Sequence, residues 1–398
     1  MTRISTSGAF RQGLEMMLRL QAAVDRTQRQ LTTGRRLLSP ADDPIAAARS
    51  LGMRESLSQL GQYDRNATMA KNRLGFEETT LKGVTDVLQR VRELALQAAN
   101  GSQSDESRHM IAVELRQHVE ALVELANQQD GNGRYLFSGH QDAVPPVGRN
   151  GNAFVYQGDD GQRSIRIGDD RLVADGDPGS EVFFRIRDGN GRFAVVAGAG
   201  NAGTGVVGPG SVDPGAAYDG EAYTVRFVDA ATWEVEDSGG TVVATGSFAN
   251  GDSIAFAGIR FPIDGQPAAG DEFRVRPSAP RDMFSMVAAL AEAIDTPAGD
   301  DAARAAVTNR INEGLLSLDQ ALGRVLDVQT RIGSRLSAIE SQADANGALA
   351  LGLEETLAEI EDLDYAEALS RLSIQITMLE AAQKAFVETR NLTLFNVL

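Results

Sequence analysis

Hydrophobic residues recur with alternating spacings of four and three at both ends of the chain. One stripe comprises Tyr365, Leu369, Leu372, Ile376, Leu379, Gln383 and Phe386, and the other comprises Phe10, Leu14, Met17, Gln21, Val24, Gln28 and Leu31. This spacing places the members of each stripe on one narrow face of a helix, as in a coiled coil. Because neither helix can bury its stripe alone, the pattern predicts that the two ends of the chain pair.

The charges at the two ends favour this pairing. Residues 1–40 contain seven arginines against Glu15 and Asp25, a balance of +5, whereas residues 349–398 contain three basic and nine acidic residues, a balance of −6. Opposite charges beside two apolar stripes support association, although each exposed ion pair contributes little. The stripes themselves support an intramolecular core and an interface between subunits equally well.

A third stripe predicts a long helix after the first one. Asp43 followed by Pro44 is typical of an N-cap and a first helical position, and Asn100–Gly101 ends the pattern near Ala99. A helix of this length would extend for about 80 Å, which suits a rod better than a globule. Ser104, with acidic residues after it, predicts the start of the next helix.

Helical patterns return after residue 280. Asp282 is placed to cap a short helix, and Thr296–Gly299 interrupts the pattern before a second long stripe. We expect a bend in that stripe at Asn346–Gly347. The apolar phase slips between Ile360 and Tyr365, which predicts a joint before the last helix.

Two short segments carry turn residues. The predicted loop and cap residues are Gly34, Pro40, Asp42, Asp43 and Pro44, and the predicted hairpin residues are Asn132, Gly133, Tyr135 and Phe137. Asn-Gly is a hairpin-type turn signal, and the two aromatic residues after it alternate as in a strand.

The middle of the chain has a different composition. Nine of the 12 prolines lie between Pro145 and Pro280, and 24 of the 41 glycines lie in residues 141–279, among short segments of alternating hydrophobicity. This pattern predicts an antiparallel β domain, with a flexible loop from Gly198 to Gly210.

The fold predicted is therefore mainly α with a β-rich insertion, in which both chain ends build a long antiparallel coiled-coil or helix-bundle rod. The expected parts are a terminal coiled coil (1–40 and 365–398), a helical rod with a hairpin (41–140 and 280–364) and the β domain (141–279). Two independent helical domains joined by a β domain are the alternative.

Composition excludes several classes of function. The net charge of −17 argues against a nucleic-acid partner, and no apolar run has the length needed to span a membrane. The first residues contain no secretion-signal pattern. The chain has no cysteine, which removes disulfides, thiol catalysis and thiolate metal sites.

No motif predicts an enzyme, a cofactor or a metal site. The segment Gly198–Gly203 matches a dinucleotide fingerprint in its letters, but it lacks the following helix that the motif requires. None of His109, His118 and His140 lies in a zinc-protease motif. Segments that begin like calcium loops, at Asp130 and Asp188, lack the glycine at position six and the glutamate at position twelve.

Five segments carry a resemblance to a known family. Thr33-Gly-Arg-Arg-Leu-Leu-Ser-Pro-Ala-Asp-Asp-Pro resembles the loop after the first helix in the bacterial flagellin superfamily, in the form of its hook-associated members. Asp130-Gly-Asn-Gly-Arg-Tyr-Leu-Phe-Ser-Gly resembles the helix-to-hairpin signature of the hook-filament junction family, hook-associated protein 3. Arg331-Ile-Gly-Ser-Arg and Ile360-Glu-Asp-Leu-Asp-Tyr-Ala resemble the C-terminal helices, and Leu394–Phe395 resembles the terminal Ser-Leu-Phe, with Thr393 in place of Ser.

This resemblance implies a structural, secreted protein of the bacterial flagellum, polymerised in a ring between hook-associated protein 1 and flagellin. It further implies export in an unfolded state by the flagellar type III apparatus, with an export chaperone on the C-terminal region. The implied assembly interface comprises Phe10, Leu14, Met17, Val24, Leu31, Leu369, Leu372, Ile376, Leu379, Phe386, Leu394 and Phe395. Flagellin itself, or a secreted coiled-coil adhesin or phage-tail fibre, is the alternative.

Overall fold

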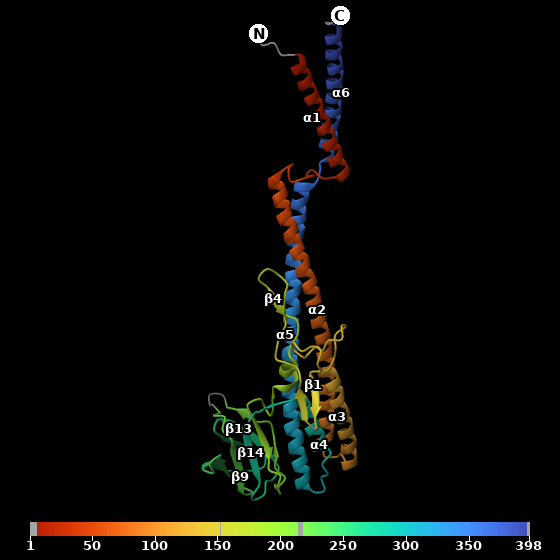
Figure 1. The fold of residues 1–398 in the computed structure, drawn as a ribbon. Helices are drawn as coiled ribbons and strands as arrows, with labels where there is room; N and C mark the ends of the chain where they lie inside the picture. The colour runs from red at the N-terminus through yellow and green to blue at the C-terminus, as the bar shows by residue number, and fades with distance from the viewer. Residues whose placement is uncertain (1–5, 152, 214–217, 396–398) are drawn as a thin grey trace. The chain divides into compact units, whose positions relative to one another are not determined.

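The computed structural model describes residues 6–151, 153–213 and 218–395, and it describes their side chains except at residues 6, 7, 9 and 389–395. The chain forms two compact units, one of Met1–Arg65 with Gln342–Leu398 and one of Asn66–Ser341. The helices are α1 (Thr6–Thr33), α2 (Pro44–Ala98), α3 (Asp105–Ala126), α4 (Met283–Ile294), α5 (Asp301–Glu361) and α6 (Tyr365–Phe395). Figure 1 shows their order along the chain.

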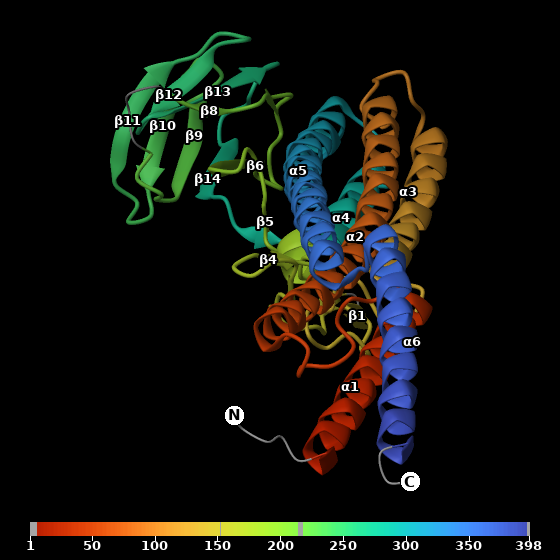
Figure 2. The same ribbon diagram turned by 90° about the horizontal axis from the view of Figure 1, so that it is seen from above.

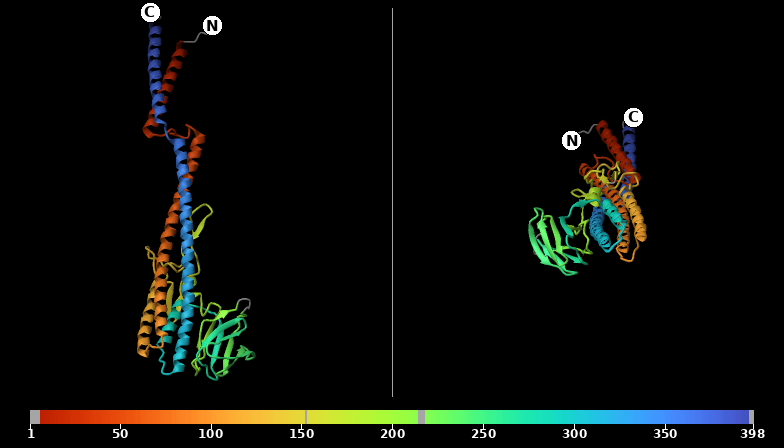
Figure 3. Two further views of the ribbon diagram at one scale, coloured as in Figure 1. Left: turned by 180° about the vertical axis from the view of Figure 1, so that it is seen from behind. Right: turned by 90° about the horizontal axis from the view of Figure 1, so that it is seen from below.

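In the first unit, α1 and α6 lie side by side, as both views of Figure 3 show. The helix α2 begins in this unit and α5 ends in it. An ion pair between Arg54 of α2 and Glu361 of α5 joins these two helices.

Local capping chemistry sets the helix starts, as the sequence predicts. The carboxylate of Asp43 accepts the amide of Ala46 at 3.0 Å, and the hydroxyl of Ser104 accepts the amide of Ser107 at 3.2 Å. Asp282 accepts the amide of Ser285 at 2.7 Å. Each cap satisfies a backbone N–H that has no partner within its helix.

The bend expected at Asn346–Gly347 is wrong, because α5 continues through both residues. Asn346 is buried and accepts a hydrogen bond of 2.9 Å from Gln342, one helical turn earlier. A glycine in the middle of a helix costs only about 1 kcal/mol relative to alanine, so a helix of this length tolerates it. The joint predicted between Ile360 and Tyr365 is confirmed, since α5 ends at Glu361 and α6 begins at Tyr365.

The second unit holds the strands. They are β1 (Val147–Asn150), β2 (Ala153–Tyr156), β3 (Ser164–Arg166), β4 (Leu172–Ala174), β5 (Ile186–Arg187), β6 (Phe193–Ala197), β7 (Val206–Val207), β8 (Ser211–Val212), β9 (Tyr223–Asp229), β10 (Thr232–Asp237), β11 (Val242–Ser247), β12 (Ser253–Phe256), β13 (Ile259–Asp264), β14 (Glu272–Pro277) and β15 (Pro280–Arg281). Every described pairing is antiparallel. A π-helical turn, η1 (Ser180–Phe184), interrupts them.

Two sheets of this unit face each other. One has the strand order β11-β10-β9-β14-β6, and in the other β13 pairs with β12, β7 and β8. Figure 2 shows β9, β10 and β11 side by side. Inward-facing residues of both sheets, such as Phe227, Phe261 and Phe273, share one buried core. We call this region, residues 193–277, the sandwich.

A second core in the same unit contains residues of α2, α3, α4 and α5. Ile167, Val182, Phe183 and Ile186 also belong to it, and all four are almost completely buried. The part of the predicted insertion that precedes the sandwich therefore packs with the helices and not with the two sheets.

Side chains form hydrogen bonds to the backbone of the segment from Gly198 to Gly210, for which the sequence predicts a flexible loop. Asp271 accepts the amides of Ala202 and Gly203, at 2.8 and 3.1 Å. Asn309 of α5 accepts the amide of Val207 at 2.8 Å and donates to the carbonyl of Gly205 at 2.9 Å. The side-chain amide of Asn309 thus forms the two backbone hydrogen bonds that a neighbouring strand would form. These bonds connect the sandwich to α5.

Candidate assembly interface

The terminal helices α1 and α6 are antiparallel. The rings of Phe10 and Phe386 lie with their centroids 4.8 Å apart, and further along the pair the hydroxyl of Thr27 donates to the side-chain oxygen of Gln375 at 2.9 Å. A Cβ atom at Gly13 would lie 3.2 Å from the ring of Phe386. Glycine at this position therefore allows the two helices to approach closely.

The covered stripe on each helix again follows the four-three spacing. It comprises Gly13, Met17, Leu20, Val24, Thr27 and Leu31 on α1, and Ala368, Leu372, Gln375, Leu379, Ala382 and Phe386 on α6. The predicted residues Met17, Val24, Leu31, Leu372, Leu379 and Phe386 belong to these stripes. Four others, Phe10, Leu14, Leu369 and Ile376, are exposed, and the side chains of Leu394 and Phe395 lie outside the described ones.

Large apolar side chains remain on the uncovered faces of both helices. On α1, Leu14 and Leu18 are 41% and 58% exposed, and on α6, Leu369 and Ile374 are 56% and 53% exposed. Met16, Ile376, Met378 and Val387 are exposed as well. Exposed apolar side chains gathered on one pair of helices make these faces a candidate interaction surface.

The end of α1 is joined to the segment between α5 and α6. The amide of Leu363 donates to the carbonyl of Gly34 at 3.0 Å, and the amide of Arg36 donates to the carbonyl of Glu361 at 2.7 Å. Gly34 has a φ of +71°, and a Cβ atom there would lie 2.9 Å from the hydroxyl oxygen of Tyr365. The backbone conformation favours glycine at this position, and a larger residue would also have to displace the hydroxyl of Tyr365.

Arg36 also caps the C-terminus of α5. Its guanidinium donates to the carbonyl of Ile360 through two nitrogens, at 2.7 and 3.1 Å. The last carbonyls of a helix have no partner within the helix and carry partial negative charge. A positive donor at this point therefore stabilises the helix end where the phase slip occurs.

The predicted loop residues form a compact turn. Pro40 occupies the second position of a turn closed by the amide of Asp42 and the carbonyl of Ser39, at 3.0 Å. The carboxylate of Asp42 pairs with Arg26 of α1 and accepts the amides of Leu38 and Ser39. Burial alone would raise the pKa of Asp42, but these two amides and the charge of Arg26 outweigh it and lower the pKa.

The predicted hairpin is present as a turn at Asn132 and Gly133 with a single antiparallel bridge beside it. Asp130 accepts the amides of Asn132 and Arg134, at 2.8 and 3.1 Å, and Gly133 has a φ of +76°. The strand expected through Tyr135 and Phe137 is reduced to one bridge between Gln129 and Tyr135. Phe137 is fully buried.

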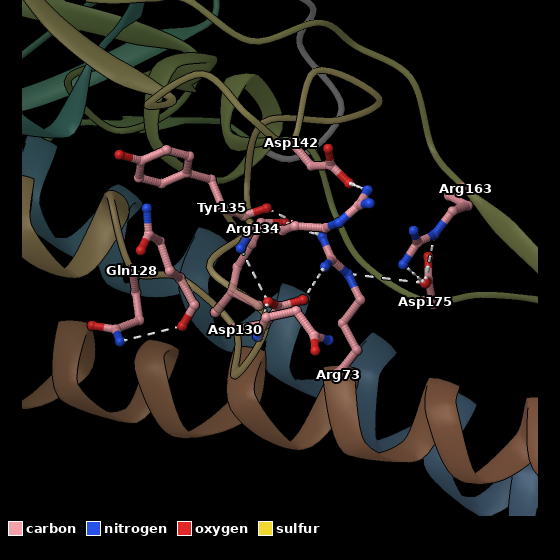
Figure 4. A network of polar contacts seen from close by, with 11 residues as sticks. Arg73, Gln128, Asp130, Arg134, Tyr135, Asp142, Arg163 and Asp175 are labelled. Carbon is pink, nitrogen blue, oxygen red and sulfur yellow. Dashed lines mark hydrogen bonds and ion pairs between the residues drawn. The ribbon is translucent and has the colours of Figure 1, made fainter.

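Arg73 of α2 binds the segment around this turn (Figure 4). Its guanidinium donates to the carbonyls of Tyr135 and Leu136, each at 3.2 Å, and pairs with Asp130 at 3.2 Å. Asp175 lies 3.9 Å from Arg73 and also binds Arg163, so this network joins α2 to the loop and to the strand β4.

A second buried ion pair lies next to it. Both oxygens of Asp177 accept from Arg335 of α5, at 2.8 and 3.0 Å, and the amide of Asp177 donates to Glu77 of α2 at 3.1 Å. Glu77 is 1% exposed, and its second oxygen has no hydrogen-bond partner among the described residues. Burial, reinforced by the charge of Asp177, raises the pKa of Glu77 well above its ordinary value.

Sequence reasoning missed these buried charges, since their partners lie 57 to 158 residues apart in the chain. One signal was available. Glu77 occupies a position of the apolar stripe between Leu74 and Leu81, and an acidic residue in such a position requires a buried partner.

No group of three or more histidine, aspartate or glutamate side chains in the ranges that the structure describes could hold a metal ion. None of the described helices combines the length and hydrophobicity needed to cross a membrane.

Known proteins resemble the chain along its whole length. Residues 4–142 match the model of the bacterial flagellin N-terminal helical region. The flagellar hook-associated protein 3 of Escherichia coli K12 is 25% identical over 397 residues, which cover 99% of each chain.

Solved structures agree with this comparison. The crystal structure of FlgL from Xanthomonas campestris is 34% identical, with a TM-score of 0.73 over 77% of this chain and 99% of that one. The flagellar junction protein FlgL from Legionella pneumophila is 31% identical, with a TM-score of 0.72 over 78% of this chain and 100% of that one. The flagellin model covers only the N-terminal third, whereas the hook-associated relative matches from end to end, so flagellin is a distant relative.

Proposed function

The chain belongs to the flagellar hook-associated protein 3 (FlgL) family, and we propose that it assembles into the junction between hook and filament through α1 and α6. It is a structural protein of the external flagellum, at the hook-filament junction. The specific contacts proposed are with other copies in a ring, with hook-associated protein 1 on the hook side and with flagellin on the filament side.

The observation that carries this proposal is the exposed apolar surface of the terminal helices. Phe10 on α1 and Leu369 on α6 are about half exposed even though the two helices contact each other. Full burial of a side chain of this size contributes about 1.5–3 kcal/mol. Association with neighbouring subunits would therefore stabilise helices that cover each other on one side only.

Export in an unfolded state, with a chaperone on the C-terminal region, belongs to the same proposal. The absence of cysteine is compatible with this route, because no disulfide would have to form after export. The exposed apolar faces of the terminal helices are compatible with it as well.

Deletion of the gene tests the proposal. Deletion cells should keep intact hooks but lack attached filaments, and flagellin should accumulate in the medium. Electron microscopy and analysis of the culture supernatant measure these two effects, with re-expression of the native chain as the control. Normal filaments on the deletion cells would exclude a junction role.

A further inference from the structure

A groove rich in arginine lies in the first unit. Its cavity of about 650 Å³ is bounded by α1, by α6 and by the loop between α1 and α2. Arg19, Arg26, Arg36 and Arg371 line it, Ala22 and Ala23 give it small apolar walls, and Asp42 and Asp43 are its acidic members. We call this cavity the arginine groove.

Both acidic residues of the arginine groove already have partners within the chain. Asp42 holds Arg26 and two backbone amides, and Asp43 caps the first turn of α2. Arg36 also has a partner, since its guanidinium caps the C-terminus of α5.

Two arginines of the groove have only weak partners. Arg19 lies 4.0 Å from Glu15 in an ion pair whose side chains are 84% and 70% exposed, and Arg371 lies 3.7 Å from Glu367, which is 71% exposed. Pairs of this kind contribute little. The Nε–H of Arg371 is buried without an acceptor among the described residues, so the groove retains positive charge and an unused donor.

The same unit carries a surface of complementary character. Asp344, Leu351, Glu354, Glu355 and Glu359 lie on the exposed side of α5, whose opposite side is covered at Asn346, Leu353 and Ile360. Helical periodicity places these exposed residues on one face. Leu351 is 57% exposed between acidic neighbours. We call this face the acidic stripe.

We propose that the arginine groove receives the acidic stripe of a second copy of this chain. Leu351 of that copy would enter between the small side chains of Ala22 and Ala23, and Glu354 and Glu355 would pair with Arg19 and Arg371. This contact rests on the proposed self-assembly and adds to it the surfaces that meet. Complementary charge fixes the register of such a contact and excludes wrong pairings.

Site-specific cross-linking tests the contact, because the chain has no native cysteine. One full-length variant carries Ala22→Cys and another carries Leu351→Cys. When they are mixed under assembly conditions and oxidised, a covalent dimer should form. The control replaces Ala22→Cys with Gln28→Cys, an exposed position of α1 outside the groove, and this pair should give little dimer.

Charge neutralisation is the second measurement. Arg19→Gln with Arg371→Gln should raise the concentration needed for half-assembly about fivefold or more, as expected for losing two ion pairs. Gln21→Glu with Gln28→Glu changes the net charge by the same amount at exposed positions outside the groove, and it should have little effect. Added salt should weaken assembly of the native chain and reduce the difference between it and the Arg19/Arg371 variant.

The outcomes separate this inference from the proposed function. If assembly proceeds while neither the cross-link nor the charge effect appears, the groove contact is wrong and the junction role stands. If the native chain does not associate with itself under any assembly condition, the proposed ring and the groove contact both fail.

Discussion

The ring of Phe10 on α1 contacts the ring of Phe386 on α6, with centroids 4.8 Å apart, yet Phe10 remains 47% exposed. The helix pair therefore covers only one side of its largest side chains. Because ordering each residue costs about 1–2 kcal/mol of backbone entropy, one-sided burial leaves such a pair marginal in stability.

We therefore predict that residues 1–40 and 365–398 exchange their amide hydrogens rapidly in the dilute monomer and become protected only on assembly. Hydrogen exchange measured by mass spectrometry at low and high protein concentration checks this. Amides of α2 beyond residue 65 serve as the internal reference. Strong protection of Leu369–Phe386 in the monomer would show that the ends fold without partners.

Phe386→Ala should destabilise the α1–α6 pair by about 1–2 kcal/mol, since the side chain is partly buried against Phe10 and Gly13. Val387→Ala is the matched control, because Val387 is the next residue and is 55% exposed. In the monomer, the Phe386 variant should lose residual helical circular dichroism and the Val387 variant should not. Equal losses would mean that the aromatic contact contributes nothing to the pair.

Gly34→Ala should destabilise the first unit by about 1–3 kcal/mol, because its φ of +71° is unfavourable for alanine and its Cβ would meet Tyr365. Gly352→Ala is the control: this helical glycine has open space around it, and alanine there should stabilise the helix by about 1 kcal/mol. Thermal unfolding of the assembled protein, in which residues 1–40 and 365–398 are expected to be ordered, measures both changes. Adding Tyr365→Phe should recover part of the Gly34→Ala loss, and no recovery would mean that the backbone conformation alone is responsible.

The predictions that succeeded rest on local chemistry. Asp43, Ser104 and Asp282 cap helices with their own side chains, and proline or glycine marks the breaks nearby. Such signals can be found in a single sequence because each one acts within four residues.

The features that were missed depend on contacts across the chain. Arg73 binds two carbonyls where the sequence predicts a strand, and α5 continues through Gly347, where the sequence predicts a bend. The stripe predicted for the terminal helices shares Met17, Val24 and Leu372 with the covered stripe but also includes Leu369, which is exposed. Periodicity shows which residues share a face, but it does not show which edge of that face meets the partner.

Glu77→Gln should raise the melting temperature of the second unit near neutral pH. Burial raises the folded-state pKa of Glu77, so the folded protein loses stability as the pH rises from the ordinary value of about 4.5 through that raised pKa. The neutral amide avoids this loss and can still accept the amide of Asp177. Asp177, Arg335 and Arg73 are the charged groups that face this position.

The pH dependence separates this effect from a general gain in stability. The advantage of Glu77→Gln should shrink as the pH falls through the raised pKa of Glu77 toward 4.5, because the native carboxyl becomes protonated over this range. Glu78→Gln, at the neighbouring position whose side chain is paired with Lys82 and 35% exposed, should show no such trend. A Glu77→Gln protein less stable than the native chain at pH 7 would mean that the charged form is needed by Arg73 and Arg335.

The sandwich should be removable without unfolding the rest of its unit. The amide of Asp188 donates to the carbonyl of Ala279 at 3.1 Å, and the amide of Ser278 donates to the carbonyl of Arg192 at 3.0 Å. The two chain segments that lead into and out of the sandwich therefore lie side by side. Replacing residues 193–275 with a short Gly-Ser linker should therefore keep a cooperative thermal transition and helical circular dichroism.

Replacing residues 145–278 removes Ile167, Val182, Phe183 and Ile186 from the helical core. At about 3–5 kcal/mol for a buried phenylalanine alone, this longer replacement should lower the melting temperature strongly. Equal stability of the two variants would show that residues 145–192 contribute nothing to that core.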